Sequence, residues 1–529
     1  MSNRYDAFNR IAPDYDFRRT TEGAYVIIPA DPAVPHVAES VDYLIPEWQE
    51  RLAAEGSDTF GQAQVVYDMA RAYARKVTQY QERVPLVTRV NQYTGDDGIP
   101  RVLIDLGDRL TGFVVQVGPA GWYVHDPRTE GGLFDWTPVW HREANFQPLP
   151  LPDESPDRVP GEAKAWFREM LALSDRDWHL VWLWLMSVYF PHWTQQGLMF
   201  VASSQMGKSL RSAWLLSFLH PADPTLGGIG GDFPTTERGW GSLMHTSPIL
   251  AFDDVESISP SQHQAMKQVI TGAAFRTQTL YETRGTTTTT GKRPLLITAS
   301  GTPAGFRDDL RNRIWTVSPT RPPLGRDLDA EFKRMAPAIF ADLLDDLVIA
   351  LKGFPDGLAE MDALIAAGQP VRPREIRALA RSLDQATGAQ YETAMLEERQ
   401  DTLQAAAEED RFARVVYEFV KAHPAGGELS NDDLLSELRG TALGMFDFES
   451  AGALDRAQWF PQDTGRMGSW LGRKADSLAS VGVVFHARRG AKGIRLRSWD
   501  PLPGVPEPQP IITVNVHPAE GSHAQEAFS

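Results

Sequence analysis

Residues 200–210 (FVASSQMGKSL) constrain the fold of this chain more than any other stretch of its sequence. A short apolar run leads into a loop of small and polar residues, and an apolar segment with helical spacing follows. A strand, a loop and a helix in this order form a P-loop, in which backbone N–H groups and a helix N-terminus bind nucleotide phosphates. The segment therefore predicts an α/β core with a nucleotide site.

The loop residues have distinct expected roles. Lys208 reaches the β- and γ-phosphate oxygens, and the Ser209 hydroxyl is a ligand of Mg²⁺. The motif G-x-x-x-x-G-K-[ST] has Ala202 in place of its first glycine, which the loop tolerates if Ala202 stays out of the left-handed region. The residues expected at the nucleotide are Ser203, Ser204, Gln205, Met206, Gly207, Lys208, Ser209 and Leu210.

The acidic partner that a P-loop needs follows in residues 248–254 (PILAFDD), an apolar strand that ends in two carboxylates. Asp253 is expected to hold Mg²⁺ through water, and Asp254 to orient and deprotonate the attacking water. Glu256 is a less favoured substitute for Asp254. The alternative is a helix N-cap after a core strand, since Asp is favoured at that position.

A third apolar strand, residues 294–300, ends in Thr298, Ala299 and Ser300. A polar residue at this strand end can contact the γ-phosphate or its water, which is the sensor role; a solvated strand end is the alternative. Arginines follow at 307, 311 and 313. Arg313 is the first choice for a cation that reaches a neighbouring subunit's γ-phosphate, and a local ion pair with Asp308 or Asp309 is the alternative.

Residues 275–285 alternate in polarity and lead into a run of five threonines, which predicts a hairpin or an exposed loop. Arg284, Lys292 and Arg293 place positive charge near its tip. In a ring, such a hairpin would project into the central channel and follow a nucleic acid backbone. A solvated β-turn is the alternative.

The bulk properties indicate a folded globular protein. A length of 529 residues predicts about three or four domains. The chain has no cysteine, which excludes disulfides and thiolate chemistry and fits a cytoplasmic protein. The longest apolar stretch, residues 180–190, is too short to span a membrane, and the N-terminal residues lack the apolar core of a signal peptide.

The net charge of −17 argues against a protein that coats nucleic acid with its whole surface. Positive charge is nevertheless concentrated near the C-terminus, where one acid, Asp476, stands among eight basic residues. These are Arg466, Arg473, Lys474, Arg488, Arg489, Lys492, Arg495 and Arg497.

The order of these motifs resembles superfamily 3 helicases of the AAA+ class, especially the helicase-like ATPases of bacterial phages and mobile elements. The resemblance covers roughly residues 160–325, about a third of the chain. It implies Lys208 and Ser209 on ATP, Asp253 and Asp254 on Mg²⁺ and water, and Arg313 as the finger that acts in trans. It also implies that Lys267 is the family's basic residue after the acidic strand, and that Ser300 replaces the usual sensor asparagine.

The same resemblance raises the question of an N-terminal primase, for which the sequence shows no convincing set of carboxylates. Asp105 and Asp108 lie beside a predicted hairpin and are expected to be turn residues.

Residues 410–500 predict three helices and a basic hairpin with glycines at its tip, which together indicate a winged helix. Its DNA contacts are expected at Arg473, Lys474, Arg488, Arg489 and Lys492. A protein-binding winged helix with a solvated basic face is the alternative.

The expected fold is therefore multidomain α/β, with a parallel-sheet AAA+ core preceded by a helical and small β region and followed by a winged helix. A proline-rich segment, residues 148–160, is expected to be a linker. The expected parts are 1–85 (mixed, then helical), 86–150 (small antiparallel β module), 160–325 (ATPase core), 326–405 (helical), 410–500 (winged helix) and 501–529 (disordered tail).

The function expected from these features is an ATP- and Mg²⁺-dependent DNA translocase or helicase that works as a ring, a hexamer, in replication of a phage or mobile element. Single-stranded or forked DNA would be its partner, and no membrane partner is expected. Two alternatives stay open: a nucleotide-dependent DNA-binding initiator or scaffold with weak hydrolysis, and an ATPase switch in anti-phage defence.

Overall fold

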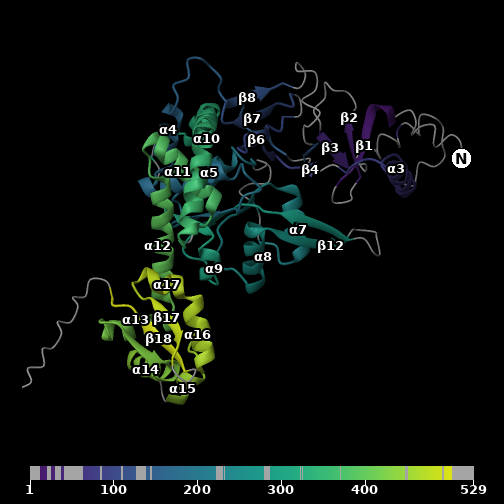
Figure 1. The fold of residues 1–529 in the computed structure, drawn as a ribbon. Helices are drawn as coiled ribbons and strands as arrows, with labels where there is room; N and C mark the ends of the chain where they lie inside the picture. The colour runs from purple at the N-terminus through teal and green to yellow at the C-terminus, as the bar shows by residue number, and fades with distance from the viewer. Residues whose placement is uncertain are drawn as a thin grey trace, which may run out of the picture. The chain divides into compact units, whose positions relative to one another are not determined.

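The structure is a computed structural model with two compact units, Met1–Arg399 and Gln400–Ser529 (Figure 1). The residues that it describes are 12–20, 25–29, 37–40, 50, 63–83, 86–108, 111–126, 139–142, 146–221, 230, 233–278, 286–321, 323, 326–369, 371–446, 451–490 and 494–502. The expected tail, 501–529, falls almost wholly outside them.

A four-stranded parallel sheet lies at the centre of the first unit. Its strands run in the order β11-β14-β10-β15, so that β14 separates the strand before the P-loop from the strand that carries the two aspartates. The parallel α/β core predicted from the sequence is thus confirmed. The strands are β10 (Gly197–Val201), β11 (Leu250–Phe252), β14 (Leu295–Ala299) and β15 (Ile314–Val317).

The chain leaves β10 toward one side of the sheet and crosses back to β15 on the other side, so the carboxyl end of β10 is the point where the topology switches. Ligands of open α/β sheets bind at such a point. The helices of this region are α6 (Lys208–Leu216), α7 (Glu237–Thr246), α8 (Pro260–Thr271) and α9 (Asp308–Arg311).

At the edge strand β15, outward N–H groups donate hydrogen bonds to acidic side chains. Thr316 donates to a carboxylate oxygen of Glu398 (2.8 Å) and Ser318 to one of Asp177 (2.9 Å), and both acids are buried. An unpaired strand edge invites pairing with another chain, so these contacts protect the sheet.

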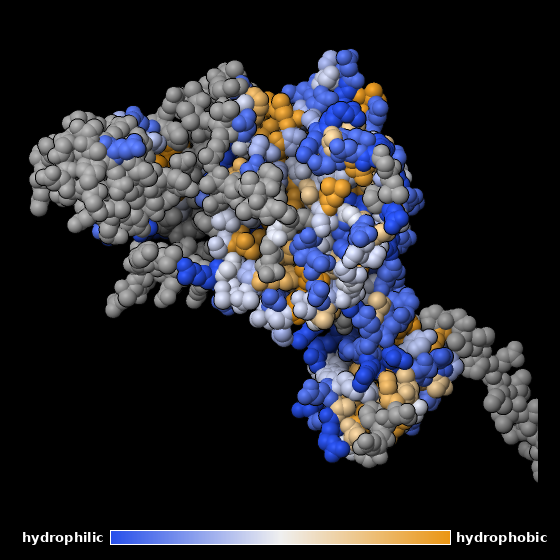
Figure 2. Space-filling model, turned by 180° about the vertical axis from the view of Figure 1, so that it is seen from behind, coloured by the Kyte–Doolittle hydropathy of each residue, from blue (hydrophilic) through white to orange (hydrophobic). Residues whose placement is uncertain are grey.

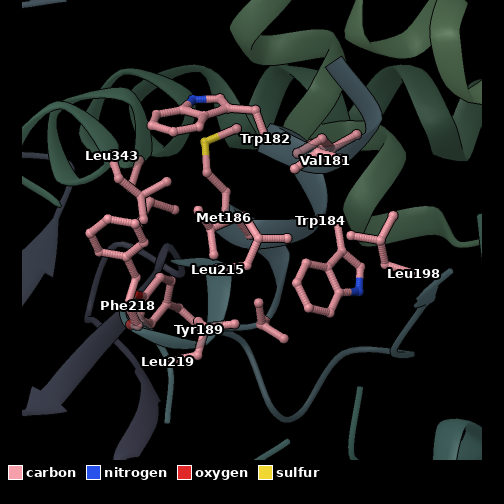
Figure 3. Packing of buried hydrophobic residues seen from close by; sticks show 14 of the residues in the cluster. Val181, Trp182, Trp184, Met186, Tyr189, Leu198, Leu215, Phe218, Leu219 and Leu343 are labelled. Carbon is pink, nitrogen blue, oxygen red and sulfur yellow. Dashed lines mark hydrogen bonds between the residues drawn. The ribbon is translucent and has the colours of Figure 1, made fainter. Parts of the chain in front are cut away.

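Helices α4 (Glu162–Leu171) and α5 (Asp175–Ser187) pack into a large core rich in aromatic side chains. Ser174 caps the N-terminus of α5, and its hydroxyl accepts a hydrogen bond from the N–H of Asp177 (3.1 Å). Figure 3 shows Trp182 and Met186 facing Phe218 and Leu215 across this core. The apolar stretch 180–190 is therefore the interior of a domain.

The region before the core contains two sheets. One is an antiparallel meander of β5 (Val90–Thr94), β6 (Pro100–Asp105), β7 (Val114–Gly118) and β8 (Gly121–His125). The other has the order β1-β2-β3-β9-β4, in which β9 pairs in parallel with both neighbours. Helix α3 spans Ala63–Val77, and the five strands are β1 (Tyr15–Arg19), β2 (Tyr25–Pro29), β3 (Val37–Ser40), β4 (Leu86–Val87) and β9 (Val139–His141).

Two expectations about this region are wrong. Residues 86–150 are not one antiparallel module, because β4 and β9 join the N-terminal sheet. The segment 148–160 is not a loose linker. Leu149 is buried, and its N–H donates to the carbonyl of Leu106. Arg158 forms an ion pair with Asp342. Prolines prevent regular hydrogen bonding but not packing, and one apolar core continues across the segment.

The expectation for Asp105 is also incomplete. It is the last residue of β6, fully buried, and its carboxylate pairs with the Arg142 guanidinium at 2.5 Å. It also accepts from the N–H of Gly107, while Asp108 accepts from the Thr111 hydroxyl. These carboxylates are committed to local structure.

Three helices follow β15. They are α10 (Leu328–Ala366), α11 (Arg374–Thr387) and α12 (Tyr391–Glu409). Helix α10 packs on α4 and on strands of the meander (Figure 1). The helical nature of residues 326–405 is as predicted.

The second unit has its own apolar core, and a three-stranded antiparallel sheet in the order β16-β18-β17. Where the sequence predicts a third helix before the basic hairpin, the structure has two helices that meet at Lys474. Its elements are α13 (Arg411–Ala422), β16 (Gly427–Ser430), α14 (Asn431–Met445), α15 (Ala451–Asp455), α16 (Thr464–Arg473), α17 (Ala475–Ser480), β17 (Phe485–Arg489) and β18 (Arg495–Trp499).

Within the described part of the chain, no helix combines the length and apolarity that crossing a membrane requires. Figure 2 shows hydrophilic side chains over most of the coloured surface, with apolar side chains in separate patches.

Candidate functional site

The loop between β10 and α6 has the backbone of a phosphate-binding turn. Gly207 caps α6 in the left-handed conformation (φ +72°), and Gln205 also has a positive φ of +67°. Ala202 has no positive φ, and its N–H donates to the carbonyl of Ala299 (3.2 Å). The condition under which alanine can replace the first glycine is therefore met, because Ala202 continues the strand pairing.

Lys208 is largely buried, and its ammonium lies inside the loop. Its Nζ donates to the carbonyl of Ala202 (2.6 Å), and it lies 3.5 Å from the carbonyl of Ser203 and 3.4 Å from the Ser300 hydroxyl. A desolvated ammonium needs acceptors. Loop carbonyls supply them here, and phosphate oxygens are the stronger acceptors for the same cation.

The two aspartates after β11 meet the P-loop at the carboxyl edge of the sheet. Ser209 Oγ lies 3.0 Å from both carboxylate oxygens of Asp253, to which it donates. Asp254 accepts a hydrogen bond from Ser300 Oγ at 3.2 Å. Residues that are about 45 to 90 positions apart in sequence thus form one polar cluster.

Asp254 has a positive φ of +50°, a conformation that Asp tolerates better than most residues. Its N–H donates to Thr298 Oγ1 (2.8 Å), which holds the turn after β11 against β14. The N-cap alternative for the pair is not what the structure shows: α8 begins several residues later, with Ser259 and Gln262 forming a capping box.

Thr298 is a site residue that the sequence singled out only as part of a strand end. It is fully buried in β14, and its hydroxyl donates to Asp253 while accepting from the N–H of Asp254. One polar side chain within the buried run Leu295–Ala299 was the available signal. Thr298 therefore orients the carboxylate of Asp253 and holds the backbone of Asp254.

Replacing Thr298 by valine is expected to raise the Mg²⁺ concentration for half-maximal ATP turnover by roughly 10-fold or more, in line with the loss of a residue that orients a metal ligand. Thr298→Ser keeps the hydroxyl and should restore the native value. The measurement is turnover against Mg²⁺ at saturating ATP. A lower melting temperature with unchanged Mg²⁺ dependence would show that Thr298 contributes only to packing.

Arg211, which no sequence motif identifies, holds the P-loop through hydrogen bonds to backbone carbonyls. Its guanidinium donates to the carbonyl of Met206 and to that of Thr320 (2.8 Å), which ties the loop to the segment after β15. Burial lowers the pKa of Arg211 to about 10, so the residue stays charged at neutral pH.

The residues at this edge fit a nucleotide with Mg²⁺. Ser209 and Asp253 offer a hydroxyl and a carboxylate, the oxygen ligands that Mg²⁺ prefers. The described residues contain no group of three or more His, Cys, Asp or Glu side chains that would form a metal cage. Mg²⁺ commonly binds in this manner, with one or two protein ligands completed by phosphates and water.

Arg313 lies at the amino end of the parallel strands, opposite the carboxyl end at which the P-loop lies. It directly precedes β15, whose first residue is aligned with Gly197 at the start of β10, whereas the P-loop follows the end of β10. Strand length places these two ends roughly 15 Å apart. Arg313 Nε is buried without a hydrogen-bond partner among the described residues.

The ion pair of Lys267 does not connect it to the cluster of Lys208, Ser209, Asp253 and Asp254. It extends from α8 and pairs with Asp309 on α9, which also lies 3.1 Å from His263. Partial burial raises the pKa of Asp309, but the hydrogen bond from Lys267 and the neighbouring charges outweigh burial and lower it. A local ion pair thus uses Asp309, the acid that was expected to compete for Arg313.

The predicted hairpin is present as β12 (Ala273–Gln278) and β13 (Thr286–Gly291), paired over six residues. Arg284 lies outside the described residues. Lys292 donates to the carbonyl of His192 (2.8 Å), and Arg293 donates to the carbonyls of Met244, Ser247 and Lys292. Arg293 is therefore engaged with the C-terminal end of α7, and its expected DNA contact does not agree with these bonds.

The basic residues predicted in the second unit differ in their surroundings. Arg473 and Arg489 are exposed, whereas Lys474 pairs with Asp410 (2.5 Å) and Arg488 forms two hydrogen bonds with Glu428. Lys492 lies outside the described residues. Arg473 and Arg489 thus keep a charge available to a ligand, and Lys474 and Arg488 have it balanced.

No family model matches the chain, and neither does any curated protein. Several solved structures show some similarity. One titled as an active helicase, Cch of SCCmec type IV, is 12% identical with a TM-score of 0.40, covering 92% of this chain and 93% of its own. The apo C-terminal region of NrS-1 is 12% identical with a TM-score of 0.36, covering 93% and 98%.

JCV helicase is 12% identical, with a TM-score of 0.22, and covers 39% of this chain and 66% of its own. Two of these three structures are titled as helicases, and the third is the C-terminal region of NrS-1.

Proposed function

We propose that this chain is a Mg²⁺-dependent ATPase that acts on DNA as a helicase-like motor. The observation that carries the proposal is the meeting of Lys208, Ser209 and the Asp253–Asp254 pair at one edge of a parallel sheet. A P-loop alone is a short motif that recurs by chance, but acidic and hydroxyl groups placed around it by two other strands form a hydrolytic site.

Each residue of the cluster has a task that its contacts support. Lys208 would exchange its bond to Ala202 for phosphate oxygens, and Ser209 and Asp253 would hold Mg²⁺, which neutralises phosphate charge when bound. Asp254 would accept the proton of the attacking water at its carboxylate. Ser300, between Lys208 Nζ and Asp254, would report the state of the phosphate to that carboxylate.

Arg313 supports assembly into a ring, as in the superfamily 3 class of AAA+ ATPases. It precedes β15, at the end of the sheet away from its own P-loop, so it would serve the site of a neighbouring subunit. A closed ring, with six subunits as the family resemblance implies, gives every subunit both a P-loop and a finger.

The second unit is the proposed DNA-binding part. Its order of elements, α13-β16-α14-α15-α16-α17-β17-β18 with β18 between the other strands, supports the proposal of a winged helix in which β17–β18 would be the wing. The β12–β13 hairpin, with Arg284 toward its tip in sequence, would follow a strand in the ring channel. Replication of a phage or mobile element is the setting that the family resemblance suggests.

A DNA-binding scaffold with slow hydrolysis is the second candidate. It is favoured by the hydrogen bond that Ser300 donates to Asp254, because a carboxylate held in this way is less free to accept a proton. The defence switch shares the ATPase site and differs in lacking strand separation.

The deciding experiment measures ATP turnover with and without single-stranded DNA for the full chain, for Lys208→Ala and for Lys352→Ala, which removes an exposed lysine of α10. Lys208→Ala is expected to lower turnover by roughly 10²- to 10³-fold, as for loss of a charge-stabilising donor. Lys352→Ala should match the native chain. Absence of turnover in the native chain would leave the scaffold as the function, and turnover without separation of a forked duplex would favour the switch.

A further inference from the structure

The second unit contains a cleft of about 420 Å³ between α16 and the β17–β18 hairpin. Gly468 and Ser469 line it from the helix, and Arg489, Arg495 and Arg497 line it from the hairpin. Pockets of roughly 300–1,000 Å³ hold small organic ligands, so the cleft has room for one nucleotide unit.

Three arginines of this cleft, Arg489, Arg495 and Arg497, share one face of the hairpin without a balancing acid. Arg489 and Arg495 are directly opposite each other in the strand pairing, and Arg497 lies two residues further along β18. Like charges directly opposite are destabilising. No ion pair or hydrogen bond found among the described residues engages these three guanidinium groups, whereas Arg488 is paired with Glu428. Their charge is available to an anion.

Arg497 lies deepest. Its side chain is partly buried, and burial lowers its pKa with no contribution from a neighbouring acid. A Cβ atom at Gly468 would lie 3.2 Å from Arg497 Nη2, so the glycine makes room for the guanidinium against the helix. A desolvated cation without a counter-ion is costly, which points to a ligand that supplies negative charge.

A second feature of the cleft is Asn431, the first residue of α14. The residue is 8% exposed and lines the cleft, and its Oδ1 has no hydrogen-bond partner among the described residues. A buried carboxamide oxygen without a partner needs a donor. The cleft therefore offers cations for an anionic group and an acceptor for an amino or hydroxyl group.

We propose that this cleft binds one nucleotide unit of a DNA strand, with its phosphate on Arg497, Arg489 and Arg495 and its base directed to Asn431. The proposal rests on the DNA-binding part of the proposed function and names the site that performs it. A nucleotide combines the two chemistries: its phosphate accepts from guanidinium groups, and its exocyclic amino groups donate. An acidic peptide offers carboxylates and backbone N–H donors in place of phosphates and exocyclic amino groups. Competition between the two ligands decides the question.

The test measures binding of single-stranded and duplex DNA to the full chain by fluorescence anisotropy, without ATP or Mg²⁺, at several salt concentrations. Arg497→Gln is expected to weaken binding by roughly 10-fold, the loss expected for one charge-assisted hydrogen-bonding group. The slope of log K against log salt should fall by about one. The control is Lys421→Gln, an equal charge change at an exposed lysine of α13, which should leave both values unchanged.

A second pair of variants keeps every charge: one fills the cleft, and the other is its control. Gly468→Leu would occupy the space against Arg497 and should weaken DNA binding by a similar factor. Gly440→Leu, at an exposed site of α14 with open space around it, should not. Thermal unfolding of each variant checks the fold.

Native-like binding and salt slope in both Arg497→Gln and Gly468→Leu would overturn the assignment of this cleft while leaving DNA binding itself intact. A native chain that binds no DNA would instead refute the DNA-binding function. Inorganic phosphate and a polyglutamate peptide serve as competitors: displacement of DNA by phosphate alone fits the proposal, and displacement by the peptide at lower concentration would contradict it.

Discussion

Arg313→Ala is expected to lower ATP turnover by roughly 10³- to 10⁵-fold, the range known for arginine fingers supplied between subunits. The reason is geometric: Arg313 precedes β15 at the edge of the sheet away from its own P-loop, and its Nε has no partner among the described residues. Binding of a fluorescent ATP analogue should change little, because Lys208 and Ser209 remain. Turnover and analogue binding are measured on the same preparations.

Mixing variants tests whether the finger acts between subunits. Arg313→Ala supplies an intact P-loop and Lys208→Ala supplies an intact finger, so mixed assemblies should regain activity that neither variant has alone. Arg307→Ala and Arg311→Ala are the matched controls, since Arg311 Nε already donates to the carbonyl of Phe306 and Arg307 is exposed. Full activity of Arg313→Ala alone, or a greater loss in either control, would refute the assignment.

Asp254→Asn is expected to lower turnover by roughly 10²- to 10⁴-fold, the contribution of a general base. Asparagine has the same shape and tolerates the left-handed backbone that residue 254 adopts, so the turn after β11 should survive. Affinity for the ATP analogue should stay within a few-fold of the native value. Single-turnover hydrolysis and equilibrium binding separate the two effects.

Glu256→Gln is the control for this variant, since Glu256 is the other acid that the sequence offered for the role and it is exposed. It should leave turnover near native. If Asp254→Asn lost nucleotide binding together with turnover, Asp254 would be a residue that shapes the site. If Glu256→Gln were the inactive variant, the base would have to be reassigned.

The local parts of the site were predictable from the sequence because local chemistry determines them. A glycine in the left-handed conformation, a lysine and a serine at the start of a helix are consecutive residues, so the turn at Gly207 and the start of α6 follow from neighbours in the chain. The parallel sheet was predictable for a similar reason, as strands alternate with helices along the core.

The errors concern contacts between distant residues. Arg293 was expected at DNA, but carbonyls at the end of α7 use its guanidinium. Residues 148–160 were expected to be a linker because of their prolines, but Leu149 bonds to Leu106, just after β6, and Arg158 pairs with Asp342 of α10. Composition reports what a segment prefers by itself, and burial against another element overrides that preference.

The sequence by itself determined that a phosphate-binding loop, two carboxylates and a basic C-terminal region occur in this order. Only the tertiary structure decided which side chains meet. The pairing of β14 between β10 and β11 brings Thr298 to Asp253, and Ser300 to both Lys208 and Asp254. The pairing of β17 with β18 places Arg489 opposite Arg495 and leaves Arg497 facing Gly468. Strand register is a property of partners far apart in the chain, so no local pattern contains it.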